Sequence, residues 1–355
     1  MRFKCRATYL FRFTVICSFL SSSTLAAAKV DKQSWQAVLA AELKKIDADT
    51  PGKLGVYVKR LSDGSTVDFD SQRDWYLAST VKVPIAVILL QMRQEGLIRF
   101  EEELTVQQSD YVDGSGEVNW KEPGSKVSIR SLFELMRTKS DSAATDMLIR
   151  RLSLPEINSR LAKIIPGGFT PLTTILQVRY DAYSELHPRA KTLTNMDFFE
   201  IKKLPTPEAK LAYLVKRMKI RKSDLKARTI DEAFERYYER KLNSSELNTF
   251  GLLLEKVAVG QILSSENRDL LLSEMEKMTT GEKRIKAGMP LGSRFAQKTG
   301  TQVRRICNMG IVRSGESVII AACLEKFHQQ AEAEAALARV GQALVASKLF
   351  QNEGP

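Results

Sequence analysis

A serine–lysine pair followed by an entirely apolar run constrains this chain more than any other feature. The run Ile85–Leu90 has no polar face, and a helix that is apolar all round belongs inside a protein. The pattern predicts a buried helix that begins near Ser79 and ends near Glu95. Ser79 and Lys82 then share one face of its first turn, because they are three residues apart. A serine beside an amine and free helix-start N–H groups is typical of a nucleophile in acyl transfer.

The Ser-x-x-Lys spacing is weak evidence alone, because composition produces it by chance. A second copy, Ser223–Lys226, lies in a highly charged run that indicates a solvated helix face. Two later motifs strengthen the first copy, namely Ser140–Ser142 (Ser-Asp-Ser) and Lys298–Gly300 (Lys-Thr-Gly). The set Ser-x-x-Lys, Ser-Asp-Asn and Lys-Thr-Gly marks class A β-lactamases and penicillin-binding proteins. The sequence resembles a class A β-lactamase-like serine hydrolase over about 33–186 and 243–349.

The resemblance implies an α/β fold of the β-lactamase/transpeptidase type. In that fold an antiparallel sheet is flanked by helices, an all-α lobe adjoins it, and the active site lies between them. We expect the α/β body at 29–78 and 290–355, the all-α lobe at 79–289, and a basic helical insertion at about 188–242. The periodicity predicts strands at 54–61, 66–69, 294–298, 306–312 and 317–323.

The resemblance also assigns roles in catalysis. Ser79 attacks an amide carbonyl to form an acyl-enzyme, Lys82 takes its proton, and Ser140 relays the proton to the leaving nitrogen. Burial and the positive neighbour Lys298 would keep Lys82 neutral. Asp141 suits the N-cap of the next helix, which is its expected role. Substrate binding is assigned to Ser142, Lys298, Thr299, Gly300 and Thr301.

These binding residues have distinct expected tasks. Lys298 and Thr299 bind the substrate carboxylate, and Gly300 lets the substrate lie close to its strand. The N–H group of Thr301 completes an oxyanion hole with that of Ser79. Ser142 stands where the family has an asparagine, and its shorter hydroxyl favours a different substrate choice. Arg304 and Arg305 either add a carboxylate contact or belong to the ordinary surface.

The sequence departs from the family where hydrolytic members place a glutamate. Arg179 and Asp181 match the ion-paired start of the family's omega loop. An alignment anchored on them puts the glutamate's position at Ser184, and one anchored on Glu185 puts it at Tyr183. Neither residue is acidic, so Glu185 serves as deacylation base only if the loop shifts by one residue.

Three functions therefore remain open. The overall resemblance favours an exported β-lactamase, and the missing glutamate favours a penicillin-binding or DD-peptidase-like protein that releases its acyl group slowly. The substrate is then a small β-lactam or a cell-wall peptide. The third function is a non-catalytic exported binding protein that uses the basic insertion, and the intact serine and lysine motifs argue against it.

The insertion carries most of the positive charge. Residues 187–243 hold 15 Lys and Arg against 8 Asp and Glu. The excess indicates either solvated helices or binding to an anionic envelope surface through 188–242. Its aromatic residues are expected to dock it on the body, and no nucleic-acid motif is present.

The first 28 residues have the pattern of a secretory signal peptide. Arg2, Lys4, Arg6 and Arg12 precede an apolar segment, and Ala26–Ala28 offers a cleavage site. The pattern predicts a periplasmic or secreted protein without a transmembrane span after cleavage, and an uncleaved anchor is the alternative. Removing these four basic residues lowers the formal net charge from +12 to +8.

Metal, histidine and disulfide chemistry are not expected. His187 and His328 are the only histidines, so neither a metal cluster nor a Ser-His-Asp triad is predicted, and no cofactor is implied. Cys307 and Cys323 would remain after cleavage. Two cysteines in an exported protein favour a disulfide. A hairpin around Ser314-Gly315, however, places Cys307 opposite Ala322, which argues against the pair unless a bulge shifts the register.

Overall fold

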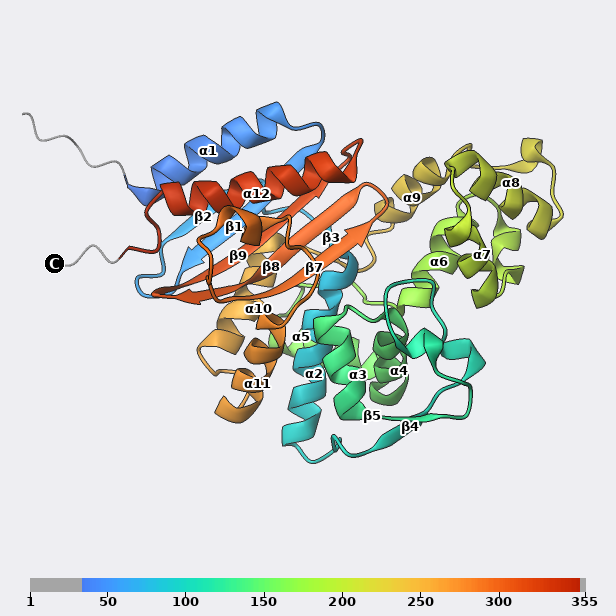
Figure 1. The fold of residues 1–355 in the computed structure, drawn as a ribbon, viewed down its shortest axis with the longest axis horizontal. Coiled ribbons are helices and arrows are strands. Elements are labelled where there is room, and N and C mark those ends of the chain that lie inside the picture. Colours follow the sequence, from blue (N-terminus) through green and yellow to red (C-terminus); the bar gives the residue numbers. More distant parts are fainter. Residues whose placement is uncertain (1–33, 352–355) are drawn as a thin grey trace, which may run out of the picture. The chain divides into compact units, whose positions relative to one another are not determined.

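An antiparallel five-stranded sheet in the order β2-β1-β9-β8-β7 forms the centre of the fold (Figure 1). The structure is a computed structural model that describes residues 34–351. The predicted signal peptide, 1–28, lies outside the described residues. Within them, no helix is both long and apolar enough for a membrane crossing. The strands are β1 (Lys53–Arg60), β2 (Thr66–Phe69), β7 (Phe295–Gln302), β8 (Arg305–Ser314) and β9 (Glu316–Glu325).

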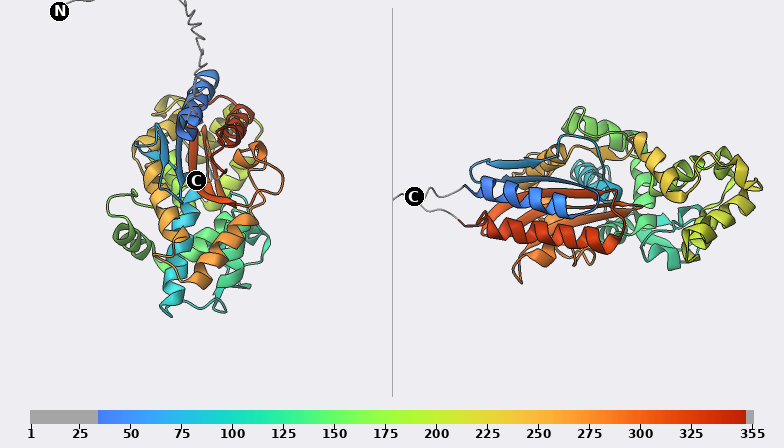
Figure 2. Two further views of the ribbon diagram at one scale, coloured as in Figure 1. Left: turned by 90° about the vertical axis from the view of Figure 1, so that its left-hand side faces the viewer. Right: turned by 90° about the horizontal axis from the view of Figure 1, so that it is seen from above.

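Helices α1 (Trp35–Asp49) and α12 (Gln330–Ala346) cover one face of the sheet (Figure 2). The alternating residues Leu54, Val56 and Val58 of β1 enter the core that these helices share. The other face meets α10 (Leu247–Ala258) and α11 (Ser265–Glu276).

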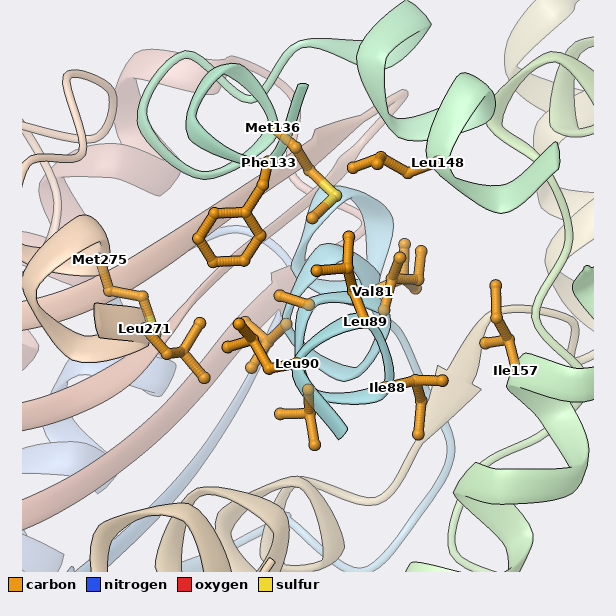
Figure 3. Packing of buried hydrophobic residues seen from close by; sticks show 14 of the residues in the cluster. Val81, Ile88, Leu89, Leu90, Phe133, Met136, Leu148, Ile157, Leu271 and Met275 are labelled. Atoms are coloured by element: carbon orange, nitrogen blue, oxygen red, sulfur yellow. The ribbon is translucent and has the colours of Figure 1, made fainter. Parts of the chain in front are cut away.

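The helical lobe surrounds the predicted apolar helix, which the structure confirms as buried. Every residue from Lys82 to Leu90 is buried, and the helix packs against α3 (Ile129–Thr138), α4 (Ser142–Leu152), α5 (Leu154–Ile164) and α11 (Figure 3). Each buried leucine or isoleucine contributes about 1.5–3 kcal/mol to folding. The start differs slightly from expectation, because a 3-10 turn, η1 (Ala78–Val81), holds Ser79 and the α-helix begins at Lys82. The lobe helices are α2 (Lys82–Gln94), α3 (Ile129–Thr138), α4 (Ser142–Leu152), α5 (Leu154–Ile164) and α6 (Ile175–Ser184).

Short elements connect these layers. Two small ladders pair β3 (Trp75–Tyr76) with β6 (Ser244–Ser245) and β4 (Glu103–Thr105) with β5 (Lys126–Ser128). The remaining 3-10 turns are η2 (Gln108–Asp110), η3 (Val118–Trp120), η4 (Pro188–Thr192), η5 (Lys222–Asp224) and η6 (Ile285–Gly288).

The basic insertion is helical and docks through its aromatic residues, as predicted. It holds α7 (Asn195–Lys203), α8 (Pro207–Met218) and α9 (Ile230–Glu239). The Tyr76 ring contacts the rings of Tyr237 and Tyr238. The Tyr183 ring contacts those of Phe198 and Phe234. The insertion thus shares an apolar core with both the body and the lobe.

The prediction of unpaired cysteines is wrong. Cys307 and Cys323 form a disulfide between β8 and β9, where they lie directly opposite each other. The hairpin turns at Gly315 alone, with a φ of 75°, so Ser314 pairs with Glu316. A turn centred one half-residue earlier would pair Cys307 with Ala322. Because side chains alternate along a strand, that small difference decides whether the two sulfurs meet.

Candidate active site

The structure brings Ser79 and Lys82 together at the start of α2. Lys82 Nζ lies 3.3 Å from Ser79 Oγ. The preceding residue, Ala78, has a positive φ of 47°, which is uncommon for a residue with a side chain. The surrounding fold therefore holds this turn in a conformation that costs energy, as is usual beside functional groups.

Lys82 is buried and its ammonium group is poorly solvated. Burial lowers the pKa of Lys82 to about 7, although the charges of Asp141 and Asp146 oppose this shift. The positive charges of Arg137 and Arg179 lower the pKa further. Burial is the expected cause, and the repulsion between Lys82 and the expected neighbour Lys298 lowers the pKa of Lys298. Lys82 can therefore be neutral near neutral pH and accept a proton.

Ser140 links Lys82 to Lys298. Its hydroxyl oxygen accepts hydrogen bonds from Lys82 Nζ at 3.1 Å and from Lys298 Nζ at 2.8 Å. Ser140 lies between α3 and α4 with a positive φ of 57°. Lys298 is fully buried on β7. Burial lowers its pKa well below the usual value, and the positive charge of Lys82 lowers it further. The three predicted motifs thus converge on one hydroxyl group.

Asp141 caps α4, as the sequence predicts. Its Oδ1 accepts from the N–H of Ala144 at 2.9 Å. Its Oδ2 also accepts from the N–H groups of Glu117 and Val118 at 2.6 and 3.0 Å, so one carboxylate fixes both the helix and the loop beside it. Ser142 is held by the same loop, because its N–H donates to Ser115 O at 2.8 Å.

Strand β7 forms the opposite wall. A Cβ atom on Gly300 would lie 2.6 Å from Leu77 O and 3.1 Å from Ser79 N, so only glycine allows this strand to pass so close to η1. Thr299 is hydrogen-bonded to Thr280 through their hydroxyl groups. The close approach places the Thr299–Thr301 edge alongside the Ser79 turn.

A cavity of about 430 Å³ lies over this constellation. Ser79, Ser140, Ser142, Thr299 and Thr301 line it, whereas Lys82 and Lys298 lie buried beneath its surface. The other lining residues are Tyr76, Ala78, Val81, Asp113, Gly114, Ser115, Ile175, Val178, Arg179, Lys202, Asn243, Thr280, Arg284 and Gln302. Among the described residues, no group of His, Cys, Asp or Glu is arranged to hold a metal ion.

Arg284 is the arginine that the sequence interpretation missed. Its guanidinium donates to Gly300 O at 2.8 Å, to Cys307 O at 3.0 Å and to Thr301 Oγ1 at 2.6 Å. It also pairs with Glu334 at 3.3 Å. Nothing in the local sequence distinguishes Arg284 from the neighbouring Lys283 and Lys286.

Arg304 and Arg305 do not line the cavity. Arg304 donates to the carbonyl groups of Lys326 and Phe327. Arg305 is buried and pairs with Glu235 at 2.7 Å. Both arginines therefore have structural partners away from the serine.

The expected omega-loop start is a helix here, and its ion pair is different. Arg179 pairs with Asp113 at 2.7 Å rather than with Asp181, and Asp181 pairs with Arg240 at 3.3 Å. Glu185 lies 3.8 Å from the same Arg240 and is outside the cavity lining. Tyr183 and Ser184 are also absent from the lining.

The first residue of α6, Ile175, faces the cavity in place of Tyr183, Ser184 and Glu185. Ile175 lines the cavity, and its N–H donates to Asp146 Oδ1 at 2.7 Å. Asp146 Oδ2 accepts from Leu176 N at 2.9 Å, so both carboxylate oxygens hold the start of α6. Burial raises the pKa of Asp146 to about 6, while these hydrogen bonds oppose the shift.

Comparison with known proteins identifies the family. A model of the Beta-lactamase enzyme family matches residues 38–347. The chain belongs to this family. Beta-lactamase 3 of Bacillus cereus is 25% identical over 256 residues, which are 72% of this chain and 63% of that protein. The chain thus spans less than two thirds of that relative. A β-lactamase of Bacillus licheniformis is 22% identical over 84% of this chain and 78% of its own length.

Solved structures share the fold of this family member. PBP-A superposes with a TM-score of 0.67 at 18% identity, covering 90% of this chain and 98% of PBP-A. A variant of the last common ancestor of Gram-negative class A β-lactamases gives 0.66 at 19% identity, covering 88% and 99%. The predicted family and the predicted β-lactamase/transpeptidase-like fold are therefore confirmed.

Proposed function

We propose that this chain is an exported serine acyl-enzyme former that reacts with β-lactam or cell-wall peptide amides and releases the acyl group slowly. Neutral Lys82 removes the proton of the Ser79 hydroxyl as its oxygen attacks the amide carbonyl. The N–H groups of Ser79 and Thr301 stabilise the resulting oxyanion. The C–N bond then breaks, and Ser140 passes a proton to the leaving nitrogen and regains one from Lys82.

Recognition of a carboxylate on the leaving part is assigned to the β7 wall. Lys298 and Thr299 are the expected contacts, and Arg284 adds a third positive or polar group through its place beside Thr301. The donors of Arg284 are engaged by Gly300, Cys307, Thr301 and Glu334, so it acts by orienting Thr301 and the β7 edge. Ser142 is the proposed contact for the substrate amide on the opposite wall.

The proposal of slow acyl release rests on one observation: the described residues that line the cavity include no free carboxylate. Among the described lining residues Asp113 is the only acid, and Arg179 neutralises it. Asp146 has both oxygens engaged with backbone N–H groups, and Glu185 lies outside the lining. Hydrolysis of an acyl-enzyme needs a base within hydrogen-bond reach of water. The structure therefore supports the penicillin-binding alternative over an efficient β-lactamase.

Export is part of the proposal. The segment 1–28 has the pattern of a signal peptide, and disulfides such as Cys307–Cys323 persist mainly in oxidising compartments.

Intact-mass measurement with benzylpenicillin tests the function. We expect a lasting adduct on the wild-type protein and none on Ser79→Ala. Rapid loss of the drug without an adduct would instead establish turnover, and the protein would then be an efficient β-lactamase. An unmodified protein with intact drug would contradict both lactam functions.

A further inference from the structure

Helix α7 of the insertion forms part of the active-site cavity. Lys202, near its end, lines the cavity, and its Nζ donates to Gly114 O at 3.1 Å. Asn195, at its start, donates to Gln108 O at 2.7 Å and to Tyr111 O at 3.0 Å. The helix is therefore fixed at both ends to the loop 108–116, which forms the lobe side of the cavity.

Within that loop, Gly114 alone lies between Lys202 and Ser142, the proposed contact for the substrate amide. A Cβ atom on Gly114 would lie 2.1 Å from Ser142 Oγ, so the two residues are in direct contact. Lys202 thus lies on the Ser142 side of the cavity. Arg284 lies on the other side, beside Thr301 of β7.

Lys202 differs from the other cations of the cavity, because within residues 34–351 it is paired with no carboxylate. Among the described lining residues the cations are Arg179, Lys202 and Arg284. Arg179 pairs with Asp113 at 2.7 Å and Arg284 with Glu334 at 3.3 Å. An ammonium group has three donors, and the hydrogen bond to the Gly114 carbonyl uses one. The exposed Lys202 therefore keeps donors and an unneutralised charge for a ligand.

We propose that Lys202 is a specificity-determining residue that binds a second anionic group, carried by the acyl part of the substrate. The inference rests on the proposed function, in which the β7 wall binds the carboxylate of the leaving part. A substrate with one carboxylate on each side of the scissile amide would meet Lys298 and Thr299 at one wall and Lys202 at the other. The basic insertion thereby selects dianionic substrates.

Two penicillins that differ by one carboxylate provide the test. Carbenicillin is benzylpenicillin with a carboxylate on the side-chain α-carbon, so it carries the charge on the acyl part. Affinities for both are measured by calorimetry in a Ser79→Ala background, where no acyl-enzyme forms. Lys202→Met is compared with Lys203→Met, a matched control whose parent lysine pairs with Glu200 and does not line the cavity.

We expect Lys202→Met to weaken carbenicillin binding about fivefold and to change benzylpenicillin binding less than twofold, because an exposed ion pair has an effect of this size. Lys203→Met should change neither affinity, and Lys202→Arg should retain the preference. The preference should also decrease at high salt. An equal loss for both drugs would mean that Lys202 only fixes the loop, and an unchanged ratio would also overturn the proposal.

Mass measurement on the Ser79 protein separates the two proposals. If neither drug forms an adduct but the Ser79→Ala background shows the Lys202-dependent ratio, the acyl-enzyme proposal is wrong and the dianion site stands. If both drugs form adducts and the ratio does not depend on Lys202, the dianion site alone is wrong. Absence of measurable binding of either drug to the Ser79→Ala protein would overturn the dianion site, and absence of an adduct on the Ser79 protein as well would overturn both proposals.

Discussion

Lys82 Nζ donates to the carbonyl oxygen of Ser140 at 2.6 Å. This contact fixes the amine beside the two hydroxyl groups between which it must move a proton. When Lys82 is neutral, one N–H satisfies the carbonyl and the lone pair remains for the Ser79 hydroxyl. When Lys82 is charged, no lone pair exists and acylation through it stops.

The acylation rate should therefore rise with pH through about 7. The folded pKa of Lys82 is lowered from its usual value to about 7, mainly by burial, so the neutral base predominates above that pH. Below it, each pH unit should reduce the rate about tenfold. The measurement is the adduct formation rate with benzylpenicillin from pH 5 to 9. A rate that stays constant down to pH 5 would contradict Lys82 as the base. Lys82→Arg, which stays charged, should reduce the rate at least about 100-fold.

A carboxylate at Ile175 should shorten the life of the acyl-enzyme. Ile175 lines the cavity at the start of α6, and Asp146 holds its backbone N–H. A glutamate there would meet the electropositive helix start and could activate water. We expect Ile175→Glu to speed decay of the benzylpenicillin adduct by about tenfold or more.

The matched control for that change is Ile175→Gln, which has the same shape without the charge. Adduct decay is followed by intact mass after the free drug is removed. Equal acceleration by glutamine would indicate that water access, and not a base, limits release.

Local sequence patterns predicted most of the framework. The apolar run at Ile85–Leu90 identified the buried helix, because no other environment stabilises it. Alternation along β1 and β2 identified the first hairpin within one residue of its bounds. The three motifs identified Ser79, Ser140 and Lys298, whose contacts follow from the family's fold.

Features that depend on tertiary contacts were not predictable in the same way. The disulfide depends on the exact centre of the turn at Gly315, and one residue of register changes which side chains meet. The partner of Arg179 is Asp113, 66 residues away in the chain, whereas the family pattern predicted its sequence neighbour Asp181. Arg284 and Lys202 join the cavity through packing of distant elements, which no local spacing encodes.

Reduction of the disulfide should destabilise the fold. Cys307 and Cys323 are 16 residues apart and 1% exposed, and closing a loop of this length contributes roughly 3 kcal/mol. We expect chemical denaturation with a reductant to show a free energy of unfolding lower by about that amount. The double variant Cys307→Ser/Cys323→Ser should be insensitive to the reductant. Two free thiols in the native protein under oxidising conditions would contradict the pairing.

The far end of the insertion should bind anionic membranes. From the last turn of α8 to the start of α9, seven exposed cations accompany one acid, Asp224. The cations are Lys216, Arg217, Lys219, Arg221, Lys222, Lys226 and Arg228. Asp224 pairs with Arg221 and Asp197 pairs with Arg217, so the charge of the other five cations attracts anionic headgroups. Each basic residue near such a surface contributes about 1 kcal/mol.

Co-sedimentation with vesicles tests this surface, using phosphatidylglycerol vesicles beside neutral phosphatidylcholine vesicles. Replacing Lys219, Lys222 and Lys226 by glutamine should reduce binding to the anionic vesicles at least about tenfold. The control replaces three exposed lysines of the α/β body, Lys44, Lys53 and Lys348, so the net charge falls equally. If both triple variants lose binding to the same extent, net charge and not the insertion attracts the membrane. Ser79→Ala should bind like the wild type, because the headgroup contacts and the acylation site involve different residues.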